Sequence, residues 1–107
     1  MGLFGRREKT FEEKYAHDEE LKFKILARRA ALLGSWAASL LGLTGDAADQ
    51  YSQGIIELSV AEAGDEPLFR RLRADFDAKG LKITDRQIRR QMQDLLQQAT
   101  AEIEKKG

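Results

Sequence analysis

Few residues in this chain could do chemistry. Its 107 residues include one histidine, His17, and no cysteine, so thiolate catalysis and cysteine-based zinc sites are excluded. No histidine-based triad is available to activate the serines and threonines. Adjacent carboxylates such as Glu12 and Glu13 are typical of a solvated helix face. The sequence therefore predicts a protein that is not an enzyme and that holds no metal and no cofactor.

Six arginines in the second half of the chain could hold a phosphate if they gather on neighbouring helices. They are Arg70, Arg71, Arg73, Arg86, Arg89 and Arg90. Three of them are followed four residues later by an aspartate, as in Arg71–Asp75, Arg73–Asp77 and Arg90–Asp94, which is the spacing of surface ion pairs on a helix. Surface pairing is the favoured interpretation, and weak nucleotide binding by a nucleotide sensor is the alternative.

Composition indicates one helix-rich domain. Hydrophobic residues make up 42% of the chain, and 18 basic residues balance 18 acidic ones, so the overall basic excess of a nucleic-acid-binding protein is missing. The most apolar segment, 30–43, is shorter than the ~20 residues that a membrane-spanning helix needs. We expect a cytoplasmic protein that binds no nucleic acid, does not insert into a membrane and is monomeric when free.

The elements that position these side chains are helices. β-branched residues are scarce, and in the last segment apolar residues recur at helical steps of four, three, four and four, in the series Ile88, Met92, Leu95, Ala99 and Ile103. Glycines and capping residues divide the chain, with Asp65 expected to cap one helix and Thr84 with Gln87 forming a capping box before another. We predict an all-α four-helix bundle over residues 19–107, with helices at about 19–42, 46–63, 66–79 and 84–104.

The first 18 residues do not fit this bundle. Phe4, Phe11 and Tyr15 fall within about 40° of one another on a helical wheel, and a charged turn separates them from the apolar stripe of the first helix. We therefore expect residues 1–18 to be a flexible arm that extends the first helix when its aromatic line meets a groove on another protein. In the alternative interpretation, Phe11 and Tyr15 fold back onto the bundle.

Three stretches of the sequence carry a resemblance to a known family. They are "FEEKYAHDEELKFK", "ARRAALLGSWAASLLGLTGDAADQY" and "AGDEPLFRRLRADFDAKG". Together they resemble subunit zeta, the small ATPase inhibitor of alphaproteobacterial F-type ATP synthases, and the similarity runs from about Phe4 to the C-terminus. A generic helical adaptor for an unrelated partner is the alternative.

The resemblance implies a four-helix bundle whose N-terminal segment inhibits ATP hydrolysis. In that family the segment becomes helical at the interface between the catalytic α and β subunits, close to γ, and blocks hydrolytic rotation on the cytoplasmic side of the inner membrane. It also implies the partner-binding residues of this chain. The apolar anchors would be Phe4, Phe11 and Tyr15, and the polar contacts along the same segment would be Arg6, Arg7, Lys9, Glu12, Glu13, Lys14, His17 and Asp18.

Overall fold

A computed structural model describes Tyr15 and residues 18–106, with the backbone alone for Lys106. These residues form four α-helices and no strand: α2 (Glu19–Leu40), α3 (Gly45–Ala61), α4 (Glu66–Ala78) and α5 (Asp85–Lys106). The all-α bundle of four helices expected from the periodicity is confirmed. The expected arm lies outside the described residues except for Tyr15 and Asp18.

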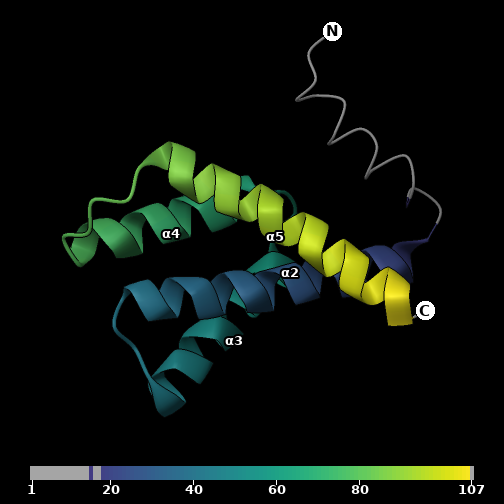
Figure 1. Cartoon of the computed structure of the whole chain (residues 1–107), viewed down its shortest axis with the longest axis horizontal. Coiled ribbons are helices and arrows are strands. Elements are labelled where there is room, and N and C mark those ends of the chain that lie inside the picture. Colours follow the sequence, from purple (N-terminus) through teal and green to yellow (C-terminus); the bar gives the residue numbers. More distant parts are fainter. Residues whose placement is uncertain (1–14, 16–17, 107) are drawn as a thin grey trace, which may run out of the picture.

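The helices surround one principal core (Figure 1). The loop after α2 turns the chain back so that α3 packs obliquely against α2, while α5 follows α4 and then crosses α2. As a result the C-terminal end of α5 lies beside the N-terminal end of α2. Arg28 of α2 and Glu102 of α5 form an ion pair across this crossing, with 2.6 Å between Nε and Oε1.

Apolar faces of all four helices meet in the core. Leu33, Ile55, Leu72, Phe76 and Ile88 are completely buried. The predicted stripe of α5 is confirmed, since its residues from position 88 to position 99 at helical spacing are buried. The rings of Trp36 in α2 and Phe76 in α4 form a T-shaped pair with 88° between their planes and 5.6 Å between their centroids, which is a geometry that aromatic quadrupoles favour.

Gly34 permits a close approach between α2 and α3. A Cβ at Gly34 would lie 2.6 Å from the Ser52 Cα, which is too close for a packing contact between two carbon atoms. The Ser52 hydroxyl uses this approach to donate a hydrogen bond of 3.1 Å to the Ala31 carbonyl in α2. The two backbones therefore pack against each other directly, as small residues allow at helix crossings.

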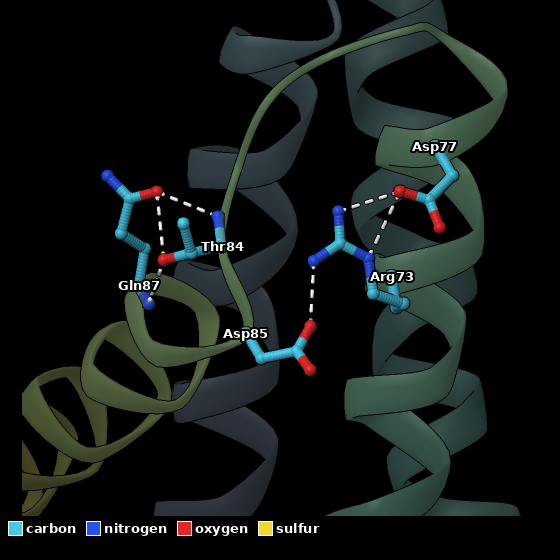
Figure 2. A network of polar contacts seen from close by, with 5 residues as sticks. All are labelled: Arg73, Asp77, Thr84, Asp85 and Gln87. Carbon is cyan, nitrogen blue, oxygen red and sulfur yellow. Dashed lines mark hydrogen bonds and ion pairs between the residues drawn. The ribbon is translucent and has the colours of Figure 1, made fainter.

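The helix ends agree only in part with the predicted caps. The capping box is confirmed: the Thr84 N–H donates to Gln87 Oε1 over 2.8 Å, and the Gln87 N–H donates to Thr84 Oγ1 over 3.1 Å (Figure 2). Asp65 occupies the N-cap position of α4 as predicted, but its side chain makes no cap bond and instead accepts a hydrogen bond from Arg29 of α2. A tertiary ion pair has replaced the local bond.

Candidate functional site

The predicted partner-binding segment is described at two positions, Tyr15 and Asp18. Its other members lie outside the described residues: Phe4, Arg6, Arg7, Lys9, Phe11, Glu12, Glu13, Lys14 and His17. The site visible in the structure is therefore the junction between the predicted segment and the bundle.

Tyr15 is seated against the bundle. It is 3% exposed and belongs to a second apolar cluster with Ile25 of α2 and Ala99 of α5. Four partly buried side chains pack against this cluster: Leu21, Leu32, Leu96 and Ile103. We call the apolar surroundings of the ring the Tyr15 seat. The Tyr15 hydroxyl donates a hydrogen bond to Glu104 Oε2 near the end of α5.

The expectation that the Tyr15 ring stays uncovered in the isolated chain is therefore wrong, and for this residue the alternative of folding back holds. The expectation assumed one straight helix, in which burying Tyr15 would also bury the charged turn after it. Instead the chain departs from helical geometry at Asp18, with φ −126° and ψ 81°. The Tyr15 ring is therefore buried among apolar side chains, while the charged side chains of Asp18, Glu19 and Glu20 stay exposed to solvent.

Asp18 connects the seated tyrosine to α2 through local hydrogen bonds. Its Oδ1 accepts from the Leu21 N–H over 2.9 Å, so it caps the helix, and its carbonyl accepts from the Lys22 N–H over 3.0 Å. The Asp18 N–H donates to the Tyr15 carbonyl over 3.1 Å. The start of α2 and the position of Tyr15 thus depend on the same residue.

Three of the six candidate arginines bind carboxylates within the fold. Arg71 lies 2.7 Å from Asp75 as the spacing predicts, and Arg73 lies 2.7 Å from Asp77. Two hydrogen bonds raise the pKa of Arg73, first the one to Asp77 and second the one to Asp85, which lies 2.8 Å away (Figure 2). Within residues 18–106, the predicted Arg90–Asp94 pair is missing.

Arg89 carries the third pair. It lies 2.7 Å from Glu66 and stacks over Phe69, with 3.8 Å from its guanidinium carbon to the ring centroid. Arg70, Arg86 and Arg90 are exposed. A phosphate bound here would compete with carboxylates that Arg71, Arg73 and Arg89 already contact, so these contacts agree with the surface-pair interpretation.

Sequence reasoning missed the polar role of Tyr51 in α3. Its hydroxyl donates to Asp75 Oδ2 of α4 over 2.6 Å, and Arg71 lies over its ring, 5.4 Å from the centroid. Burial raises the pKa of the Tyr51 phenol, and the hydrogen bond to Asp75 raises it further. The pair joins α3 to α4.

Arg29 was also missed, although its position in the sequence carried a signal. It stands four residues after Ile25 and four before Leu33, on the buried stripe of α2, and it is itself buried. A charged residue within an apolar stripe indicates a buried ion pair, and the partner is Asp65.

Neither a membrane-spanning helix nor a metal-binding cluster occurs among the described residues. Over Tyr15 and residues 18–106, no helix has the length and apolar character needed to cross a membrane. Across the same part of the chain, no group of three or more histidine, aspartate or glutamate residues is arranged to hold a metal ion.

The fold and these contacts define a small all-α protein whose N-terminal Tyr15 is docked where α2 and α5 meet. A family model described as ATPase inhibitor subunit zeta matches residues 1–102, and the chain belongs to this family. The resemblance read from the sequence motifs is confirmed. No curated protein matches the chain. Membership identifies it as an inhibitor subunit of an ATPase, which implies association with an ATP synthase.

Proposed function

We propose that this protein inhibits ATP hydrolysis by an F-type ATP synthase through residues 1–18. In this proposal the segment enters the catalytic head as a helix, at an α/β interface close to γ, and blocks rotation in the hydrolytic direction. The protein would act on the cytoplasmic side of the inner membrane. The observation that carries the proposal is the family match, which covers both this segment and nearly all of the bundle.

The residue types of the segment suit that task. Phe4, Phe11 and Tyr15 are large apolar side chains of the kind that supply most of the binding energy of an interface when a partner desolvates them. The charged residues between them are Arg6, Arg7, Lys9, Glu12, Glu13, Lys14, His17 and Asp18, and they would set the register of the inserted helix.

The bundle supplies a folded body from which the segment departs. Its principal core is built by helices α2 to α5 and does not include Tyr15, which belongs to the separate seat. Tyr15 can therefore leave the bundle without opening the principal core. This separation supports a division of labour between an inserting segment and a body that stays folded.

Purified catalytic head and the full-length chain provide the test. We expect the substitution of Phe11 by alanine to raise the concentration for half-inhibition of ATP hydrolysis by about tenfold to a hundredfold, the usual effect of truncating an interface anchor. Phe23→Ala is the matched control, since Phe23 is a phenylalanine of α2 that is 54% exposed and lies outside the segment. Equal inhibition by Phe11→Ala, Phe23→Ala and the unaltered chain would refute the proposal.

A further inference from the structure

We infer that the Tyr15 seat between α2 and α5 is an intramolecular latch, which holds Tyr15 of the inhibitory segment against the bundle and competes with the ATPase for this residue. The inference rests on the proposed function and adds a regulatory contact to it. Glu104 of α5 lies outside the inhibitory segment. Its contact with Tyr15 joins parts of the chain that are 89 positions apart in sequence.

Burial and hydrogen bonding both favour the latched state. The ring is 3% exposed among side chains from two helices, so releasing it returns a large apolar surface to water. The hydroxyl donates to the carboxylate of Glu104, and a bond to a charged acceptor is stronger than one between neutral groups. Release therefore loses both an apolar contact and a charge-assisted bond.

The latched geometry is incompatible with a continuous helix through Asp18. In such a helix Tyr15 would stand about 15 Å before Ile25 along the axis, at 1.5 Å per residue. In the structure these two residues belong to one buried cluster. Extending α2 would also bring Asp18 into helical geometry and remove its cap on the Leu21 N–H. Opening the latch and lengthening α2 are thus one conformational change.

Competition follows because one ring cannot fill the seat and a groove on the partner at the same time. When only a fraction of the molecules has the ring released, the apparent dissociation constant for the partner exceeds the intrinsic one by the inverse of that fraction. A weaker latch therefore makes a better inhibitor, although the inhibitory segment itself is unchanged.

The test uses the full chain with Glu104→Ala, and Glu57→Ala of α3 as the control. Glu57 is an exposed helical glutamate, so its substitution removes the same charge away from the seat. NMR of chains with labelled tyrosine reports the Tyr15 ring directly, and Tyr51 serves as an internal reference. We expect Glu104→Ala to move the Tyr15 signals toward those of an exposed tyrosine while Tyr51 stays unchanged, and Glu57→Ala to move neither.

The second readout is inhibition of the purified catalytic head. Glu104→Ala should lower the concentration for half-inhibition by about tenfold to a hundredfold, as expected for the loss of one hydrogen bond to a charged group. Glu57→Ala should match the unaltered chain. The latch is refuted if the Tyr15 ring stays buried in Glu104→Ala, or if the ring is released and inhibition does not strengthen. An unaltered chain that fails to inhibit refutes the proposed function itself, a result distinct from both.

Discussion

Nη2 of Arg29, in α2, lies 2.6 Å from Oδ1 of Asp65, the residue before α4, and the two ends of this ion pair differ sharply in exposure. The Arg29 side chain is 4% exposed and the Asp65 side chain is 47% exposed. Nε and Nη1 of Arg29 are buried and have no hydrogen-bond partner among the described residues. A buried charge thus depends on a single carboxylate at the surface.

This asymmetry predicts unequal effects of removing either partner. Asp65→Ala leaves the buried guanidinium unpaired and should lower the free energy of unfolding by about 1–3 kcal/mol. Arg29→Met removes the charge together with the N–H groups on its two unsatisfied nitrogens. It should therefore lower the free energy of unfolding by less than Asp65→Ala, or leave it unchanged. Urea unfolding measures both variants.

Arg28→Ala is the control. It breaks the more exposed ion pair with Glu102 and should change stability by less than about 1 kcal/mol. A more damaging Arg29→Met than Asp65→Ala would contradict this interpretation.

The contact between Gly34 and Ser52 predicts that two glycines within helices respond oppositely to alanine. Gly34→Ala forces α2 and α3 apart and should destabilise the protein by about 1–3 kcal/mol, as overpacking does. Gly54, in α3, has nothing within 4 Å of a Cβ, so Gly54→Ala should stabilise the protein by about 0.5–1 kcal/mol through helix propensity. Thermal and urea unfolding compare the two. Similar effects at both sites would show that backbone contact does not govern the α2–α3 packing.

The caps of α3 and α5 offer a second matched comparison. Thr84→Ala removes the hydroxyl that accepts from the Gln87 N–H, while the backbone N–H of residue 84 can still donate to Gln87 Oε1, and this loss should lower stability by about 1 kcal/mol. Thr44 occupies the equivalent position before α3 but makes no side-chain cap bond, so Thr44→Ala should have little effect. Chemical unfolding of the two variants under one set of conditions measures the difference. An equal loss in both variants would mean that the hydrogen bond accepted by the Thr84 hydroxyl contributes nothing to stability.

The raised pKa of the Tyr51 phenol predicts that the protein loses stability in alkali. Its pKa is raised in the folded protein above the usual value of about 10, so the folded state favours the neutral phenol. The neutral Tyr51 phenol contributes fully to the free energy of unfolding below about pH 10, which is the pKa of this phenol in the unfolded chain. The contribution is lost as the pH rises toward the pKa in the folded protein. Spectroscopic titration of the phenols should find one that ionises well above pH 10, and Tyr51→Phe should remove that transition. Persistence of the transition in Tyr51→Phe would assign it to another group.

Local patterns in the sequence were enough to predict the four helices. The apolar stripe of α5, the capping box before it and Pro67 in the first turn of α4 all act within a few residues, so their effect does not depend on the rest of the chain. Asp65 shows the limit of such reasoning. Its side chain could cap α4 locally, but the buried guanidinium of Arg29 is a stronger partner that only the folded arrangement brings near.

The candidate site could likewise be predicted from the sequence only in part. The motifs that identify the zeta family and the aromatic line of the N-terminal segment can be read from the order of residues alone, because both are properties of a linear pattern. The seat of Tyr15 could not be read, because it requires α5 to cross α2 and bring Ala99 and Glu104 to the start of that helix. Gly34 beside Ser52 and Arg29 beside Asp65 depend equally on contacts between distant segments. The sequence by itself determined which segments are helical and to which family the chain belongs. The tertiary structure alone decided which side chains those helices bring together, because packing between helix surfaces sets these contacts and spacing along the chain does not.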